Sequence, residues 1–177
     1  MKALYAYFGE FGIFDQNIPG HSFYQIGLLS SIAETYNITK FDVYNYLDGD
    51  TVEPNLGPNY PDGKIGELMQ SVTNQLVDSY RIPLNHVMKN IADGKVYDYI
   101  ILKARFRNLS TLAKKMEDAK RFELLIQYAM STGHKPENII VLDTDLSMSP
   151  GVSKRLAALK IQVLIPSIDF PGIGRSF

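Results

Sequence analysis

The stretch 96-VYDYIILKA-104 decides the fold class, because its apolar residues follow one another instead of alternating with polar ones. A run of this kind is typical of a strand that is buried on both faces of a sheet. The runs 139-IIVL-142 and 161-IQVLI-165 repeat the pattern later in the chain, and residues 2–8 and 41–47 show it earlier. The sequence therefore predicts a set of buried strands.

Helical segments separate these strands. Apolar residues recur at helical spacing over residues 21–36 and 65–80, and a longer helix is expected over 111–131. Shorter helices are expected from Pro83 to Gly94 and from Ser149 to Leu159. Strands that alternate with helices indicate a parallel sheet covered on both faces. We predict a doubly wound, mostly parallel α/β sheet of the Rossmann-like type, built as one domain over residues 1–177.

The composition narrows the functional classes. The chain is 45% hydrophobic with a net charge of −1, which supports a real core and restricts any nucleic-acid site to a local patch. The sequence has no cysteine, so disulfides and thiolate chemistry are excluded. The first residues are too polar for a signal peptide, and no apolar run approaches the ~18 residues of a membrane span. We therefore expect a cytoplasmic protein without a membrane partner.

Two carboxylates follow the buried run in 138-NIIVLDTDLSMSP-150. Asp143, Asp145 and Ser147 match the spacing of the nucleophile and acid in haloacid-dehalogenase-like phosphatases, but too few residues follow for that family's remaining groups. The same spacing is compatible with a metal site for a sugar nucleotide. The structural alternative is a helix cap, with Ser147 or Ser149 before Pro150.

The segment after the first strand ends in Gly20-His21-Ser22 at a predicted helix start. Free backbone N–H groups at such a position favour an anion, and His21 is a candidate phosphate ligand or proton carrier. The dinucleotide fingerprint GxGxxG is absent. The alternative for His21 is an exposed loop histidine.

A basic cluster follows the strand in 102-LKARFRN-108. An extended chain projects Lys103, Arg105 and Arg107 to one side, where they suit nucleic-acid phosphates. Phe106 lies between the arginines and is a candidate for stacking on a base. The lysines of the next helix are balanced by acidic residues, which favours a solvated face there.

Three segments together resemble the N-terminal domain of phage DNA β-glucosyltransferase, a GT-B enzyme that glucosylates hydroxymethylcytosine in DNA. They are 9-GEFGIFDQNIPGHSFYQIGLL-29, 98-DYIILKARF-106 and 142-LDTDLSMSP-150. The last resembles the family's catalytic-base motif, with Asp145 at the base. Ser22 stands where the family has an acidic residue, and Ser147 stands where it has an arginine.

The resemblance implies a glycosyltransferase domain that binds the acceptor, with a second, donor-binding domain expected outside this chain. The sugar would pass from a nucleotide-sugar, such as a UDP-sugar, to a hydroxymethylated base in double-stranded DNA, and a divalent metal is an open requirement. The implied catalytic residues are Asp145, His21 and Ser22. The implied substrate-binding residues are Asp143, Ser147, Gly9 and Gly20, and the implied DNA-binding residues are Lys103, Arg105, Phe106 and Arg107.

Two other functions remain open at this point. The first is a non-catalytic nucleic-acid-binding or inhibitory module on the same fold. The second is a small phosphatase or nucleotide-binding α/β enzyme that uses Asp143.

Overall fold

A six-stranded sheet in the order β3-β2-β1-β4-β5-β6 forms the centre of the molecule, and every strand pair in it is parallel. The computed structural model describes residues 1–7, 20–45, 58–79, 82–94, 96–103, 112–143 and 150–173. The strands are β1 (Lys2–Tyr7), β2 (Lys40–Asn45), β3 (Val77–Ser79), β4 (Tyr99–Lys103), β5 (Ile139–Leu142) and β6 (Gln162–Leu164). This arrangement confirms the predicted doubly wound, Rossmann-like α/β fold.

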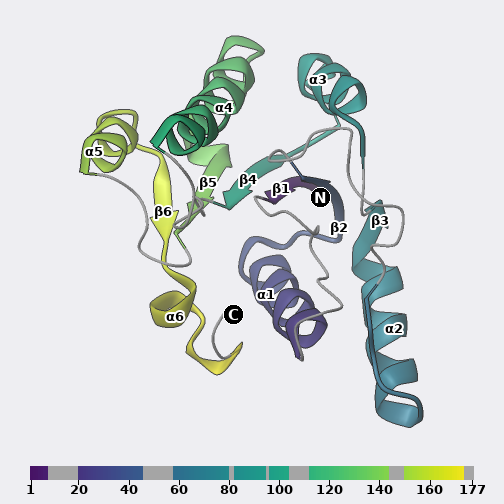
Figure 1. Cartoon of the computed structure of the whole chain (residues 1–177). Helices are drawn as coiled ribbons and strands as arrows, with labels where there is room; N and C mark the ends of the chain where they lie inside the picture. The colour runs from purple at the N-terminus through teal and green to yellow at the C-terminus, as the bar shows by residue number, and fades with distance from the viewer. Residues whose placement is uncertain are drawn as a thin grey trace.

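Helices cover both faces of the sheet (Figure 1). They are α1 (His21–Tyr36), α2 (Lys64–Leu76), α3 (Leu84–Asp93), α4 (Leu112–Ser131), α5 (Pro150–Ala158) and α6 (Pro166–Asp169), with short 3-10 turns η2 (Pro136–Asn138) and η3 (Pro171–Ile173). One apolar cluster joins α3, α4 and α5 to one face of the sheet, and a second joins α1 and α2 to the other. None of the described helices has both the length and the apolar character that a membrane span requires.

The alternation of side chains decides which face each strand residue joins. In β4, Ile100 and Leu102 belong to the α3/α4/α5 cluster, whereas Ile101 belongs to the α1/α2 cluster. In β5 the alternation runs the same way, with Val141 on the first face and Leu142 on the second. Both clusters are continuous, which explains why the strands appear in the sequence as unbroken apolar runs.

The prediction of one helix over 65–80 was wrong at its end. The helix α2 stops at Leu76, and Val77 turns to extended backbone with φ −115° and ψ 116°. Val77 then pairs with Phe41 as the start of the edge strand β3. Apolar spacing did not reveal this change, because Leu76 and Val77 are neighbours that both pack in the α1/α2 cluster. By contrast, α3 ends at Gly94 with φ 69°, as the glycine predicted.

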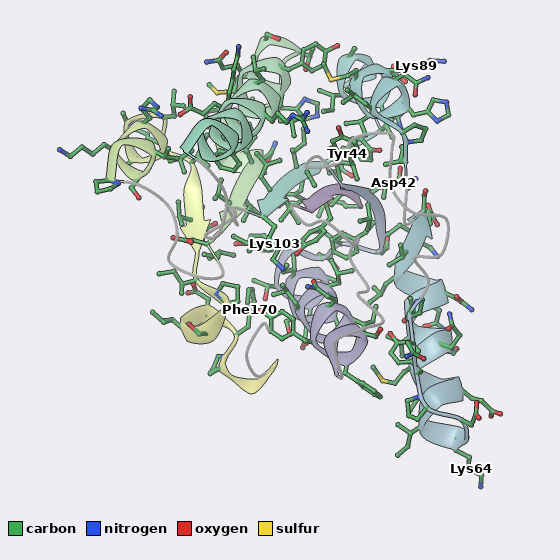
Figure 2. All side chains as sticks on the ribbon, in the orientation of Figure 1. Asp42, Tyr44, Lys64, Lys89, Lys103 and Phe170 are labelled. Carbon is green, nitrogen blue, oxygen red and sulfur yellow. The ribbon has the colours of Figure 1, made fainter. Side chains whose placement is uncertain are left out.

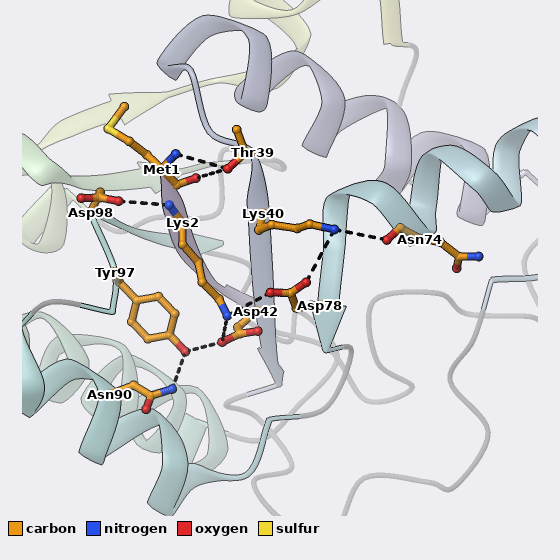
Figure 3. A network of polar contacts seen from close by, with 10 residues as sticks. All are labelled: Met1, Lys2, Thr39, Lys40, Asp42, Asn74, Asp78, Asn90, Tyr97 and Asp98. Atoms are coloured by element: carbon orange, nitrogen blue, oxygen red, sulfur yellow. Dashed lines mark hydrogen bonds and ion pairs between the residues drawn. The ribbon is translucent and has the colours of Figure 1, made fainter.

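A polar network ties together the amino ends of the strands (Figure 3). The Lys2 ammonium lies 3.2 Å from the Asp42 carboxylate and 3.0 Å from that of Asp78. The Tyr97 hydroxyl donates to Asp42 Oδ2 at 2.9 Å and accepts from the Asn90 amide. This network links the first residues of β1 to β2, β3, α3 and the approach to β4.

The same contacts shift the pKa values of three groups. Partial desolvation opposes the charged form of Lys2, but the hydrogen bond to Asp78 and the charge of Asp42 together raise its pKa. The hydrogen bond from Lys2 lowers the pKa of the Asp78 carboxyl group. Burial, reinforced by the charged Asp42, raises the pKa of the Tyr97 phenol. Tyr97 is therefore a permanent donor, and this network serves the structure of the sheet.

Candidate functional site at the carboxyl edge of the sheet

The strand order reverses between β1 and β4, which are neighbours although the chain has formed β2 and β3 between them. Ligands of doubly wound sheets bind in the crevice outside the carboxyl ends of the strands at such a switch point. The chain leaves β1 into residues 8–19 and leaves β4 into residues 104–111, both of which lie outside the described residues. The next strand, β5, ends beside β4 at the same edge. The predicted site segments therefore start from three neighbouring strands.

The predicted site residues divide into two groups. Gly20, His21, Ser22, Lys103 and Asp143 belong to the described residues. Gly9, Arg105, Phe106, Arg107, Asp145 and Ser147 lie outside them, so the roles given to these residues stay predictions. His21 is the first residue of α1, and its side chain is not among the described ones.

Lys103 differs from the expectation of an exposed phosphate-binding patch. It is the last residue of β4, pairs in register with Leu142, and is completely buried. The alternation along β4 directs its side chain to the face covered by α1, and Figure 2 shows it pointing toward that helix. Burying an ammonium costs several kcal/mol unless neighbouring acceptors compensate. The Lys103 side chain is therefore in the interior at the strand end and is not part of an open basic surface.

Asp143 is also buried, on the other face of the sheet. Its backbone N–H donates to the Leu164 carbonyl at 2.9 Å, so the pairing of β5 with β6 continues past Leu142. The alternation along β5 then places the carboxylate on the side of α4 and α5. Both helices follow strands that end at this edge, and their amino ends favour a negative charge there. The alternation along the two strands thus directs Lys103 and Asp143 to opposite faces at the same edge of the sheet.

The first turn of α1 is shaped by Gly20 and Ser22. Gly20 has φ 77°, a left-handed conformation that glycine adopts without steric cost, and as the N-cap residue it has no side chain with which to cap the helix. Ser22 is buried, and its Oγ accepts the backbone N–H of Asn59 at 2.9 Å. This contact gives Ser22 a structural role that the sequence did not predict. Its catalytic role stays a prediction.

Two buried polar residues near this site were not predicted from the sequence. Gln25 is buried on the face of α1 that packs on the sheet. It lies on the same face as Leu29 and Ile32, four and seven residues further along the helix. Tyr5 lies in β1 on the α1 side, in register with Ile101. The available signal was position: a glutamine on the apolar stripe of a helix is expected to be buried.

Helix geometry brings Gln25 to the level of Lys103. The rings of Tyr36 and Tyr99 contact each other at the other end of α1, with centroids 5.5 Å apart. From Tyr36 back to Gln25 the helix advances ~16 Å, and from Tyr99 to Lys103 the strand advances ~13 Å. Because α1 is antiparallel to the strands, moving from Tyr36 to Gln25 and moving from Tyr99 to Lys103 both lead toward the carboxyl edge of the sheet. The carboxyl edge therefore has a polar interior layer beneath α1.

Residues 58–61, here called the strap, precede α2 in the chain and contact both α2 and the first turn of α1. Asn59 binds Ser22, and the Tyr60 ring meets the Phe23 ring with centroids 5.3 Å apart. The Tyr60 hydroxyl lies 2.7 Å from Thr73 Oγ1, which itself donates to the Met69 carbonyl, so Tyr60 is the donor to Thr73. The Pro61 carbonyl lies against Gly66, where a Cβ would come within 1.7 Å of its oxygen. The strap is therefore fixed at both ends.

Among the described residues, no group of three or more histidine, aspartate and glutamate side chains could hold a metal ion. No protein-family profile matches the sequence, and no curated protein matches it. The fold and the polar layer at its carboxyl edge define a Rossmann-like α/β domain with its candidate site at the switch point.

Proposed function

We propose that this chain is the acceptor-binding domain of a glycosyltransferase that transfers a sugar from a nucleotide-sugar to a hydroxymethylated base in DNA. The observation that carries the proposal is the position of β5. Asp143 still pairs with β6 at the carboxyl edge, so Asp145, two residues further on, follows a strand that ends next to the switch point. The proposed setting is the cytoplasm, which is the host cytoplasm if a phage encodes the protein.

The proposed chemistry needs a base near the acceptor alcohol. A hydroxymethyl group is a poor nucleophile at neutral pH, and a carboxylate within hydrogen-bond reach takes its proton as the glycosidic bond forms. Asp145 has this role in the proposal. The acceptor oxygen displaces the nucleoside diphosphate of the donor in a single step, so the bond between the anomeric carbon and the diphosphate breaks as the new bond forms, and the configuration inverts. The acceptor base leaves the duplex stack to reach the site, and Arg105 and Arg107 bind the flanking phosphates.

The buried position of Asp143 favours this proposal over a phosphatase. A nucleophilic carboxylate has to reach the phosphorus of its substrate, whereas Asp143 is only 7% exposed. Asp143 is better suited to support the segment that follows it. The non-catalytic alternative, a nucleic-acid-binding module, has the same fold and is separated from the enzyme by the assay below.

The test is sugar transfer from a radiolabelled UDP-sugar to duplex DNA that contains hydroxymethylcytosine, by the full protein in which this domain occurs. Asp145→Asn is expected to lower turnover by ~10²–10⁴-fold, the usual contribution of a general base, with DNA binding retained. Asp93→Asn, an exposed aspartate at the end of α3, is the matched control and keeps full activity. Full activity of Asp145→Asn rules out the base, and DNA binding without any transfer favours the non-catalytic module.

A further inference from the structure

The dipeptide Asp-Gly occurs twice among the described residues, and a lysine follows it in the sequence both times. Asp62-Gly63 lies directly before α2, whereas Asp93-Gly94 lies at the end of α3. Both aspartates are exposed, and no hydrogen bond or ion pair joins either carboxylate to another described residue. A third such dipeptide, at residues 48–49, lies outside the described residues. The first two therefore share their local chemistry and differ in backbone structure.

An aspartate before a glycine is prone to rearrange, because glycine has no Cβ to hinder the approach of its backbone nitrogen to another group. The glycine nitrogen attacks Cγ of the protonated aspartate side chain. The new N–C bond forms as the carboxyl C–O bond breaks, and the hydroxyl leaves as water with the proton from nitrogen. One water molecule then opens the five-membered succinimide ring. Its addition to the backbone carbonyl gives isoaspartate, and its addition to the side-chain carbonyl restores aspartate, so no other reactant is needed.

The backbone at Asp93 opposes this reaction. Closing the ring requires the aspartate Cβ and the glycine nitrogen to be nearly eclipsed about the Cα–C bond, which is far from the ψ of about −42° that an α-helix imposes. Asp93 is the last residue of α3. The backbone N–H of Gly94 also donates to the Ile91 carbonyl at 3.1 Å, so the attacking nitrogen is held in the helix cap.

The backbone at Asp62 has neither of these restraints. Asp62 belongs to no helix or strand. Gly63 has φ 109° and ψ −172°, a conformation that is essentially restricted to glycine. No described residue accepts its backbone N–H. The nitrogen and the carboxyl carbon can therefore meet without melting a helix and without breaking a hydrogen bond to the described part of the chain.

We propose that Asp62-Gly63 is a modification site, at which Asp62 is spontaneously converted to isoaspartate in the folded protein. The conversion adds one atom to the backbone between the strap and α2. These two segments are in close contact there, because a Cβ on Gly66 would lie 1.7 Å from the Pro61 carbonyl oxygen. The proposal does not depend on the proposed function, and it requires no partner or ligand.

The experiment is an ageing time course of the native protein in neutral buffer, well below its unfolding temperature. Proteolysis followed by liquid chromatography and electron-transfer fragmentation assigns isoaspartate to Asp48, Asp62 or Asp93, since the product has the same mass but a different backbone. We expect isoaspartate to form at Asp62 at least about 5-fold faster than at Asp93, the factor that corresponds to one backbone hydrogen bond. In concentrated urea, where both restraints on Asp93 are lost, we expect the two rates to converge.

Two variants check the assignment, Asp62→Glu and Asp93→Glu. Glutamate keeps the charge but would have to close a larger ring, so the sites that accept a methyl group from isoaspartyl methyltransferase are expected to fall in aged Asp62→Glu and to persist in aged Asp93→Glu. Equal rates at Asp62 and Asp93 in the native protein, or no loss of methyl-accepting sites in Asp62→Glu, overturn the proposal. A difference of the same size in urea also overturns it, because the neighbouring sequence and not the fold would then set the rate.

Discussion

The two edges of the sheet use charged side chains in different ways. At the amino edge, the Lys2 ammonium forms ion pairs with Asp42 and Asp78, and the Tyr97 hydroxyl donates a hydrogen bond to Asp42. At the carboxyl edge, Lys103 and Asp143 are buried at the ends of the neighbouring strands β4 and β5, and the alternation along the strands directs them to opposite faces.

The two edges therefore place charged residues for different purposes. Charges that bind one another across β1, β2 and β3 fix the relative position of those strands. Charges at the carboxyl ends lie where the chain leaves the sheet and where ligands of this fold bind. We expect substitutions of the paired charged residues at the amino edge to change stability, and substitutions in the segments that follow β1, β4 and β5 at the carboxyl edge to change binding or turnover.

The largest expected effect on stability comes from Asp42→Ala. The substitution removes the partner of Lys2 and leaves the buried Tyr97 hydroxyl without its acceptor. Breaking a buried charged pair costs several kcal/mol, and because Lys2 is partly exposed we expect about 3 kcal/mol of unfolding free energy. Urea denaturation of the native protein and of Asp42→Ala measures this loss of unfolding free energy. Asp78→Ala is the control, because its carboxylate also binds Lys2 but is 41% exposed, and its expected loss is within ~1 kcal/mol. Equal losses in the two variants would break the distinction between buried and exposed partners.

The next effect concerns the strap at the carboxyl edge. In Gly66→Ala the new Cβ would lie 1.7 Å from the Pro61 carbonyl oxygen, so the strap or α2 must move. We expect a loss of roughly 1–3 kcal/mol, typical of overpacking, in spite of the better helix propensity of alanine.

The matched control for that substitution is Gly151→Ala in α5. Among the residues that the structure describes, a Cβ there meets only the flexible end of Arg155, at 3.7 Å. Its unfolding free energy is expected to stay unchanged or to rise by up to ~1 kcal/mol. Thermal or urea unfolding compares the two, and a neutral Gly66→Ala would show that the strap is not fixed against α2.

The smallest effect is the pH dependence of the Lys2–Asp78 pair. The hydrogen bond from Lys2 lowers the pKa of Asp78 in the folded state. The pair therefore contributes stability above the unfolded pKa of about 3.9, and this contribution disappears as the pH falls through the folded value. The difference in stability between the native protein and Asp78→Asn is expected to be within ~1 kcal/mol at neutral pH and to vanish toward pH ~2. If the difference in stability between the native protein and Asp78→Asn persists at acid pH, it comes from packing and not from the charge of Asp78.

Much of the fold could be predicted from the sequence because each element carries its own local pattern. The apolar runs predicted β4 and β5, the helical spacing predicted α1, and Gly94 marked the end of α3. The short edge strand β3 was missed, because only Val77 of its three residues is apolar and the segment becomes a strand only by pairing with β2.

The candidate site could be predicted only in part. The sequence indicated that polar segments follow β1, β4 and β5, and the strand order brings those three ends together. It did not show that Lys103 is interior, because three alternating basic residues look alike whether a helix covers them or not. It also gave no sign of the contact between Ser22 and Asn59, whose partners are far apart in the chain.

Apart from β3 and the end of α2, the runs and periodicities of apolar residues in the sequence were enough to predict which segments are strands, which are helices, and that both faces of the sheet are covered. Only the tertiary structure decided how the charges are distributed. It joined Lys2 to Asp42 and Asp78, buried Lys103 and Asp143 at the ends of β4 and β5, and set Phe23 beside Tyr60. The physical reason is that periodicity is a local property of the chain. Pairing and burial depend on residues that meet only when the strands are in order.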